Sequence, residues 1–523
     1  IINNLNFLKY VLLSVLSGLL LGLAWPTYGI TAFIFIGFVP LLHVAKSKSK
    51  FSIKIFLCFY LAFLIWNIIA TSWLYYASIG GVLFAVLVNS LLMTIVFSLF
   101  FIVSKRINSK LSYIFLISFW LCFEKFHLTW DFSWPWLNIG NVFSEFTEWI
   151  QWYEFTGSFG GTLWVLIINI LIYNVFLSII NNEKSHLLIW SIILLIFIPI
   201  TISKIILNNI DLKEKQIDVF IVQPNIDPYD EKYNRSDNDN FLYVHDLLEE
   251  NAIKNSTIIL PETFFSDGMQ INGYGTNEFL KKLSFLKDKF NSEILTGIEL
   301  FEVITDSNEI KNYSNNLNDG RWLNLFNSSI FVSNNIQYYN KSKLVVGIEK
   351  MPYKKLIEPI LGNLLMDFGG LKYSRGFDKE RKNFKSIKNF HISPIICYES
   401  VYGEYVTEYT RSGSQLFAII TNDGWWDASE GHKQHLSYAK LRAIENRRNI
   451  VRSANTGISA IINYKGEIKN SIEYGLEGII KAKVGLINKE TFYVSYGDYI
   501  FRISLFFLII ISFHFLATII KIK

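Results

Sequence analysis

Long apolar runs separated by short polar loops fill residues 1–207, and one more run lies near the end of the chain. A helix needs ~20 residues to cross ~30 Å of hydrocarbon. About eight runs approach that length: Phe7–Trp25, Ile30–Ala45, Ile55–Ala77, Val82–Val103, Tyr113–Leu128, Gly161–Ile180, Leu187–Leu207 and Ile500–Ile520. The pattern predicts an integral membrane protein with about eight transmembrane helices. Since the first run has full length and no small-residue cleavage pattern follows it, we expect a retained anchor rather than a signal peptide.

Residues 208–498 are more polar, and short β-type runs alternate there with helical ones. Strand-like runs occur at 217–223, 257–260, 293–298, 328–332, 390–397, 416–421 and 458–464, and helix-like runs at 241–254, 277–290 and 432–447. This order predicts a layered α/β domain. We therefore expect transmembrane helices 1 to 7 in residues 1–207, a globular domain in 208–498, and an eighth helix with a short tail in 499–523.

The loops between the apolar runs differ in charge. The loops after the first and third runs contain no charged residue, whereas those after the second and fourth contain Lys46, Lys48, Lys50 and Lys54, and then Lys105, Arg106 and Lys110. Cytoplasmic loops hold the excess of Lys and Arg in membrane proteins. The pattern therefore predicts that both termini are cytoplasmic and that residues 208–498 are extracytoplasmic.

Composition narrows the class of partner. The net charge of +5 is small for 523 residues, and no basic stripe would suit a phosphate backbone, so we expect no nucleic-acid partner. Of the three cysteines, Cys58 and Cys122 fall in apolar runs, which leaves Cys397 as the only thiol of the polar domain. A disulfide framework is excluded there. A lone thiol in an oxidising compartment favours a chemical role.

Residues 129–160 are rich in tryptophan, with Trp130, Trp134, Trp136, Trp149 and Trp152. Such a loop is typical of the aromatic belt at a membrane interface. It is also compatible with one wall of a substrate entrance, and the sequence leaves both interpretations open.

Three chemically active side chains each follow a strand-like run. Glu262 follows Ile258–Pro261, Lys341 follows Tyr338–Asn340, and Cys397 follows Ile395–Ile396. Strand ends are common sites of catalysis in α/β proteins. A carboxylate can accept the thiol proton, and an ammonium together with the Tyr398 N–H can stabilise an oxyanion. Taken singly, a buried inert Cys, a surface Lys and a helix-capping Glu explain the same residues.

The local motifs show a resemblance. Leu260-Pro261-Glu262, Tyr339-Asn340-Lys341 and Ile396-Cys397-Tyr398-Glu399 resemble, in that order, the catalytic motifs of the carbon-nitrogen hydrolase (nitrilase) superfamily. That superfamily uses a Glu-Lys-Cys set on an αββα sandwich. Segments 222–225, 421–426, 434–435 and 452–459, and the arrangement of apolar runs around the domain, resemble its apolipoprotein N-acyltransferase branch.

The resemblance implies a bacterial inner-membrane enzyme with its catalytic domain on the periplasmic side. It implies transfer of an acyl group from a phospholipid, phosphatidylethanolamine above all, through a Cys397 thioester to the N-terminal diacylglyceryl-cysteine of an apolipoprotein. Glu262 would be the general base, Lys341 the transition-state stabiliser, Glu349 a further essential carboxylate, and Tyr398 and Glu399 would support the cysteine. We expect no cofactor, no metal and a monomer.

One segment departs from that pattern, and the next one suggests a lipid contact. Where the family commonly has Pro-Phe-Gly-Glu, this chain has Val346-Gly347-Ile348-Glu349. Helical spacing then brings Ile357, Leu361 and Leu364 to one face after a group of lysines, although Pro359 and Gly362 weaken a regular helix. A flap lying on the bilayer and a core helix remain equal alternatives. We add Trp425 and Trp426 as candidate substrate contacts.

Other functions and sites are weaker. A membrane-anchored amidase or nitrilase would use the same cysteine chemistry but would not need eight spans. A transporter with an external binding domain would have charged or broken helices at mid-membrane depth, and the spans show little of this. His432 and His435 have no further cluster to complete a metal shell. Glu124, near the end of the fifth run, fits either a functional or a hydrogen-bonded structural role.

Overall fold

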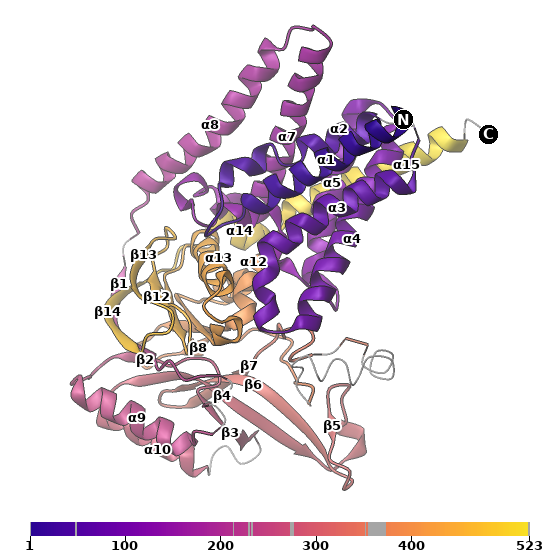
Figure 1. Ribbon diagram of the computed structural model, residues 1–523. Helices are drawn as coiled ribbons and strands as arrows, with labels where there is room; N and C mark the ends of the chain where they lie inside the picture. Colours follow the sequence, from indigo (N-terminus) through magenta and orange to yellow (C-terminus); the bar gives the residue numbers. More distant parts are fainter. Residues whose placement is uncertain are drawn as a thin grey trace. The chain divides into compact units, whose positions relative to one another are not determined.

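The computed structural model describes residues 2–47, 50–212, 214–228, 231, 234–271, 277–350, 352–353 and 373–520, with side chains from residue 7 onward (Figure 1). The chain forms two compact units. The helical unit comprises Ile1–Tyr75, Ile79–Ile210 and Tyr496–Lys523, and the sheet unit comprises Tyr76–Ser78 and Asp211–Ser495.

The helical unit is built from long apolar helices. They are α1 (Ile2–Leu23), α3 (Ile53–Thr71), α4 (Ile79–Ser104), α5 (Ser109–Thr129), α7 (Ser158–Ile180), α8 (His186–Asn209) and α15 (Tyr499–Ile520). Within the described residues, six segments are long and apolar enough to cross a membrane: 53–76, 79–104, 109–129, 158–180, 186–209 and 499–520. Only 6% of the most apolar stretch of α8 is buried, and only 11% of that of α15. Apolar helices exposed to this degree are suited to contact with lipid.

The prediction of about eight spans is not confirmed, and the second predicted span, Ile30–Ala45, is wrong as a continuous helix. A 3₁₀ helix, η1 (Thr31–Phe35), is followed by a turn and by the short helix α2 (Val39–Ser47). Pro40 has no N–H to donate, so it is tolerated only near a helix start. Asn169 of α7 accepts a hydrogen bond from Phe38 N–H (2.8 Å) and donates to the Ile34 carbonyl (2.8 Å). These two bonds satisfy the backbone where the helix breaks.

The tryptophan-rich segment folds into the helical unit as short turns: η3 (Pro135–Leu137), η4 (Ile139–Phe143), η5 (Thr147–Trp149) and α6 (Tyr153–Thr156). Glu124 is buried and accepts hydrogen bonds from Trp120 Nε1 (3.1 Å), Ile139 N–H (2.7 Å) and Thr162 Oγ1 (2.8 Å). The Glu124 carboxylate therefore anchors the segment. Trp136 is fully buried, which excludes it from an interfacial belt.

The sheet unit contains two sheets. The first has the order β14-β1-β2-β4-β6-β5, with β3 paired to β4 and β7 paired to β6. Its strands are β1 (Lys215–Gln223), β2 (Thr257–Ile259), β3 (Phe265–Gln270), β4 (Glu293–Ile304), β5 (Asn315–Asn316), β6 (Trp322–Val332), β7 (Ile336–Asn340) and β14 (Gly478–Leu486). The second has the order β13-β12-β11-β10-β9-β8. Its strands are β8 (Phe384–Lys385), β9 (His391–Ile396), β10 (Leu416–Thr421), β11 (Ile450–Ala454), β12 (Ser459–Ile462) and β13 (Ile468–Ile472).

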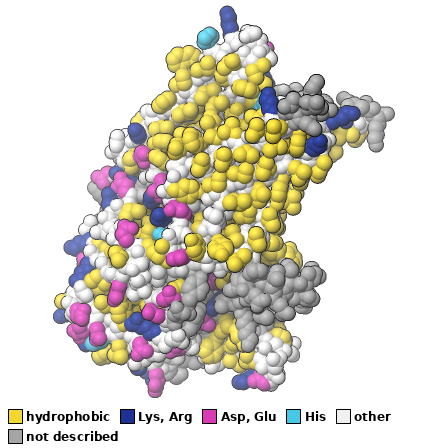
Figure 2. All heavy atoms as spheres, viewed as in Figure 1, with side chains coloured by type: hydrophobic (Ala, Val, Ile, Leu, Met, Phe, Trp, Pro, Cys, Tyr) yellow, Lys and Arg dark blue, Asp and Glu magenta, His cyan; other side chains and the backbone are white. Residues whose placement is uncertain are grey.

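Apolar side chains from both sheets meet in one buried core that includes Ile221, Leu295, Ile396 and Ile420. The outer face of the first sheet packs against α9 (Asp237–Glu250) and α10 (Glu278–Lys289). On the side of the second sheet lie α12 (Gly403–Arg411) and α13 (Glu430–Asn446), of which α13 contacts β12. Strands buried on both faces explain the continuous apolar runs of the sequence. Acidic groups gather over the sheet unit, whereas a broad hydrophobic surface covers the helices (Figure 2).

Candidate active site

Glu262 lies three residues after the carboxyl end of β2, in the first sheet. Gly297 N–H on β4 donates to the Pro261 carbonyl (3.0 Å), so the Glu262 turn lies directly against that strand. A Cβ at Gly297 would lie 2.3 Å from Thr263 N, which only glycine avoids. The result is a fixed carboxylate that is only 6% exposed.

Lys341 directly follows β7, and its N–H donates to the Asn327 carbonyl on β6 (2.8 Å). Its Nζ is 3.0 Å from Glu262 Oε1 and 3.0 Å from Glu349 Oε2, and the side chain is 1% exposed. Burial by itself would lower the pKa of Lys341, but the charges of Glu262 and Glu349 outweigh burial and raise the pKa above its ordinary value. Lys341 is therefore a permanent ammonium ion.

Glu349 joins this cluster despite the altered segment before it. Asn327 Nδ2 donates to Glu262 Oε1 (2.7 Å) and to Glu349 Oε1 (2.8 Å), and Val345 N–H donates to Glu349 Oε2 (2.8 Å). Burial raises the pKa of Glu349, but the Lys341 ammonium, the Val345 N–H, the Arg375 charge and the Asn327 amide together outweigh burial and bring the pKa below its usual range. Gly347 has φ +84°, which lets the chain turn back here.

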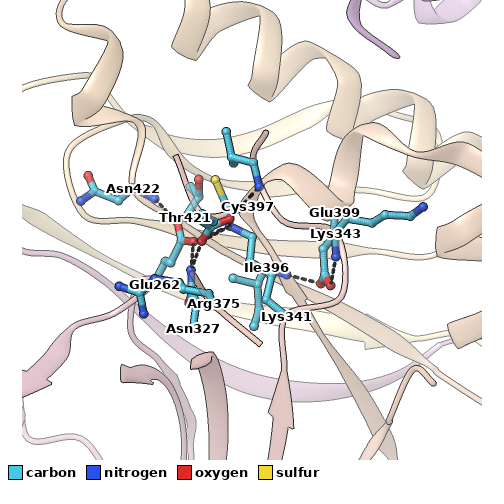
Figure 3. A network of polar contacts seen from close by, with 12 residues as sticks. Glu262, Asn327, Lys341, Lys343, Arg375, Ile396, Cys397, Glu399, Thr421 and Asn422 are labelled. Atoms are coloured by element: carbon cyan, nitrogen blue, oxygen red, sulfur yellow. Dashed lines mark hydrogen bonds and ion pairs between the residues drawn. The ribbon is translucent and has the colours of Figure 1, made fainter. Parts of the chain in front are cut away.

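Cys397 comes from the second sheet, at the end of β9, where it begins the 3₁₀ helix η8 (Cys397–Val401). Its φ of +50° lies in the left-handed region, which is strained for a residue with a Cβ. Figure 3 shows Cys397 together with Glu262, Lys341 and Thr421. Burial, and next the charge of Glu262, raise the pKa of the thiol, although Lys341 partly opposes them. The resting thiol is therefore protonated and needs a base to become a nucleophile.

Glu399 connects the Cys397 strand to the Lys341 loop. Its Oε1 accepts hydrogen bonds from Tyr339 Oη (2.6 Å), Tyr405 Oη (2.6 Å) and Ser342 N–H (2.7 Å). Its Oε2 accepts from Ile396 N–H (2.9 Å). Burial raises the pKa of Glu399 in spite of these donors, which are all neutral. Glu399 thus fixes the backbone on both sides of the site.

A second buried polar cluster, formed by His435, Asp423 and Arg452, contacts the backbone of Cys397. His435 Nε2 is 3.2 Å from the Cys397 carbonyl oxygen and 2.9 Å from Ser400 Oγ, while its Nδ1 is 3.0 Å from Asp423 Oδ1. Arg452 Nη2 donates to Asp423 Oδ2 (2.6 Å). Both imidazole nitrogens are therefore engaged by protein groups. Among the described residues, no group of three or more His, Cys, Asp or Glu side chains could hold a metal ion.

The other residues singled out from the sequence are placed as follows. The Tyr398 ring is buried and lies edge-on to Tyr402, with centroids 5.3 Å apart. Trp425 and Trp426 are half-buried in η9 (Asp423–Trp426), directly after Asn422, whose N–H donates to Glu262 Oε2 (3.0 Å). The remaining candidates lie outside the described residues: Ile357, Leu361 and Leu364.

Two site residues were not anticipated. Asn327 lies inside β6 and is only 3% exposed, and a buried polar side chain of this kind is recognised only once the structure shows its burial. Arg375 donates from its N–H to the Glu349 carbonyl (3.0 Å) and from Nη2 to Glu299 Oε2 (2.9 Å). Its charge contributes to the lowered pKa of Glu349. No sequence pattern indicates Arg375, because it lies far from the three motifs along the chain.

Comparisons with known proteins agree with this architecture. Residues 17–171 match the model of the apolipoprotein N-acyltransferase N-terminal domain, and residues 219–487 match the carbon-nitrogen hydrolase model. The chain is 26% identical to an apolipoprotein N-acyltransferase of Chlorobaculum tepidum, over 95% of each chain. It is 25% identical to that of Geobacter metallireducens, over 93% of this chain and 91% of the relative. It is 26% identical to that of Thermotoga maritima, over 94% of this chain and 91% of the relative.

These matches confirm the resemblance that the motifs around Glu262, Lys341 and Cys397 indicate. They include the helical part as well as the sheet part, so they extend beyond the motifs themselves. The chain belongs to the carbon-nitrogen hydrolase family, and within it to the branch of the apolipoprotein N-acyltransferases.

Proposed function

We propose that this protein is a membrane-bound N-acyltransferase that moves a fatty acyl group from a phospholipid to the α-amino group of a diacylated apolipoprotein, through a thioester on Cys397. One observation carries the proposal. A buried carboxylate–ammonium pair, Glu262 and Lys341, stands beside a cysteine in a chain whose membrane part also matches the N-terminal domain of apolipoprotein N-acyltransferases. The extensive apolar helices supply the lipid environment that both substrates need.

The first half-reaction begins with proton transfer from the Cys397 thiol to Glu262. The thiolate attacks the ester carbonyl of the phospholipid, and the carbonyl oxygen becomes an oxyanion. Lys341 and the Tyr398 N–H stabilise this oxyanion. The carbon–oxygen bond to the glycerol then breaks, and the leaving oxygen takes the proton from Glu262. The products are the Cys397 thioester and a lysophospholipid.

The second half-reaction reverses these roles. The neutral α-amine of the apolipoprotein attacks the thioester carbonyl, and Glu262 accepts a proton from the nitrogen. The carbon–sulfur bond breaks, and the thiolate recovers its proton from Glu262. Because the pKa of the thiol is raised, return of the proton is favourable and the resting enzyme is restored.

Residues 208–498 are the catalytic domain in this proposal, on the periplasmic side of the bacterial inner membrane, with both termini in the cytoplasm. Basic residues in the loops after α2 and α4 support this orientation. Phosphatidylethanolamine is the proposed donor, and the protein acts as a monomer. Glu349 keeps Lys341 charged, and Tyr398 and Glu399 support the cysteine. Trp425, Trp426 and the segment containing Ile357, Leu361 and Leu364 contact the lipid chains.

Intact-mass analysis of the purified full-length protein with phosphatidylethanolamine tests the proposal. Wild type should gain the mass of one acyl group, release lysophospholipid, and lose the adduct in hydroxylamine. Cys397→Ala should show neither adduct nor lysophospholipid, whereas Cys58→Ala, which removes a buried thiol of α3, should behave as wild type. Release of lysophospholipid without an adduct would exclude the thioester. Release of ammonia from small amides without any lipid would indicate an amidase instead.

A further inference from the structure

The helical unit has an unusual distribution of charge along its sequence. Every charged side chain in residues 1–123 is Lys or Arg, and the first acidic residue is Glu124. In the structure, α2 ends at Ser47, α4 ends at Ser104 and α5 begins at Ser109, so these helix ends and their lysines lie at one end of the unit. We call this region the basic end and define it by Lys46, Lys105, Arg106 and Lys110.

Two of these lysines are held close together. Lys105 Nζ donates to the backbone carbonyl of Lys46 (3.2 Å), and Lys46 Nζ donates to Ser112 Oγ (3.2 Å). The positive charge of Lys105 acts directly on Lys46. Like charges repel each other, and neither lysine forms an ion pair with a carboxylate of the described residues. The pair therefore lacks a counter-charge from within residues 1–123.

Aromatic rings hold the lysine side chains in place. Lys46 Nζ lies 4.9 Å from the ring centroid of Tyr113 and 5.7 Å from that of Phe100, and Lys105 Nζ lies 4.8 Å from that of Phe101. An ammonium over a ring face is attracted to it, so both lysines are oriented before any ligand arrives. Each ammonium carries three N–H bonds, and the hydrogen bonds described use one of them.

We propose that Lys46 and Lys105 bind the phosphate group of an anionic phospholipid at the basic end of the helical unit. The phosphate would receive hydrogen bonds from both ammonium groups and supply the missing negative charge. This site is separate from the catalytic cysteine and does not depend on the proposed acyl transfer.

A lipid is favoured over a free anion by the surface next to the pair. Phe51, which packs on Phe101 with centroids 5.4 Å apart, is 38% exposed, and Ile102 is 39% exposed. Ile102 lies in the segment 79–104, which is long and apolar enough to cross a membrane, and Phe51 lies just before another such segment, 53–76. A molecule with a phosphate head and an apolar tail can contact the lysines and this flank together, whereas inorganic phosphate can contact only the lysines.

Native mass spectrometry of the purified full-length protein tests this site. The protein is equilibrated with equal amounts of phosphatidylglycerol and phosphatidylcholine, and the ratio of the two bound lipids is measured. Wild type should prefer phosphatidylglycerol, and K46Q or K105Q should each lower the ratio about fivefold. K110Q removes an equal charge from an exposed residue of the same end and should change the ratio less than about twofold.

Three results would overturn the proposal. The first is equal binding of the two lipids by wild type. The second is a loss in K110Q as large as in K46Q, which would indicate general surface charge. The third is full suppression of the preference by excess inorganic phosphate, which would indicate a free-anion site. If K46Q does not fold, K105Q gives the same test, because Lys105 lies just outside α4.

Discussion

The sheet unit buries carboxylates in two different ways. Glu349 shares Lys341 with Glu262, so its charge is balanced by an ammonium 3.0 Å away. Glu399 is equally buried, but its hydrogen-bond donors among the described residues are tyrosine hydroxyls and backbone N–H groups. The pKa of Glu349 is lowered, while the pKa of Glu399 is raised. Neutral donors alone thus do not offset the cost of burying the Glu399 charge, whereas at Glu349 the charges of Lys341 and Arg375, together with neutral donors, do.

The two arrangements suit different tasks. A base that exchanges protons with a thiol and an amine must be ionised in the resting enzyme, and the proposed base Glu262 lies 3.0 Å from the Lys341 ammonium. A residue that holds two loops together needs many hydrogen bonds rather than a charge. Glu399 has this second character, since it joins the Ile396 strand end to the Ser342 loop.

Replacing Lys341 should have the largest effect, because it removes the ammonium that Glu262 and Glu349 share. Lys341→Met leaves both carboxylates buried without their ion-pair partner, which we expect to lower stability by about 3–5 kcal/mol. Loss of the oxyanion partner should reduce acyl transfer by at least about 10²-fold. Apparent melting temperature and thioester formation measure the two effects.

Lys343→Met is the matched control for that variant. Lys343 lies over the Tyr402 ring, 4.8 Å from its centroid. We expect a change in stability below about 1 kcal/mol, as for a cation–π contact at a partly exposed site. Equal losses in the two lysine variants would contradict the special position of Lys341.

The pH dependence of stability should differ in sign between the two carboxylates. For Glu349, the folded pKa is below the unfolded value of ~4.3, so its contribution is present above that value and is lost as the pH falls. For Glu399, the folded pKa is above ~4.3, so the folded state binds more protons and stability decreases as the pH rises through that window.

Glu349→Gln and Glu399→Gln test this difference by melting curves recorded between about pH 3 and 7. Relative to wild type, Glu349→Gln should lose least stability at the acid end, where the stabilisation that wild type gains from ionised Glu349 is smallest. Glu399→Gln should remove the part of the wild-type stability that decreases as the pH rises. Its stability relative to wild type should therefore be lowest at the acid end. If the stability of both variants relative to wild type changed with pH in the same direction, Lys341 would not distinguish the two carboxylates.

The smallest effect should come from removing one neutral donor of Glu399. Tyr405→Phe deletes a hydroxyl that lies 2.6 Å from Glu399 Oε1, and we expect a loss of about 1 kcal/mol. Acyl transfer should fall only a few-fold, because the other donors keep the loops in place. Tyr409→Phe, which deletes a hydroxyl bonded to the Pro394 carbonyl (3.2 Å), is the control and should leave acyl transfer unchanged.

The sequence predicted those elements whose residues carry a strong local pattern. Strand β10 spans Leu416–Thr421 as expected, because a buried central strand is a continuous apolar run. Strand β14 was not predicted, because lysines interrupt its apolar positions and it is defined by antiparallel pairing to β1 over 200 residues away. Long-range pairing of this kind leaves little local signal.

The site follows the same rule. Glu262, Lys341 and Cys397 could be singled out because each directly follows a strand-like run, and the structure brings them together (Figure 3). Asn327 could not be singled out in this way. It donates to Glu262 and Glu349 only because β6 pairs with β7 in this register, which the local sequence does not reveal. The positions of Arg375 and Asn422 likewise depend on how distant segments meet.

The break between η1 and α2 has a consequence for how the protein is made. The partner of Phe38 N–H and the Ile34 carbonyl is Asn169, whose side chain is synthesised 131 residues after Phe38. Unpaired backbone groups are costly in hydrocarbon, so this turn cannot settle in the membrane by itself. We therefore expect the turn between η1 and α2 to reach its final structure only after α7 has been made and packed beside it.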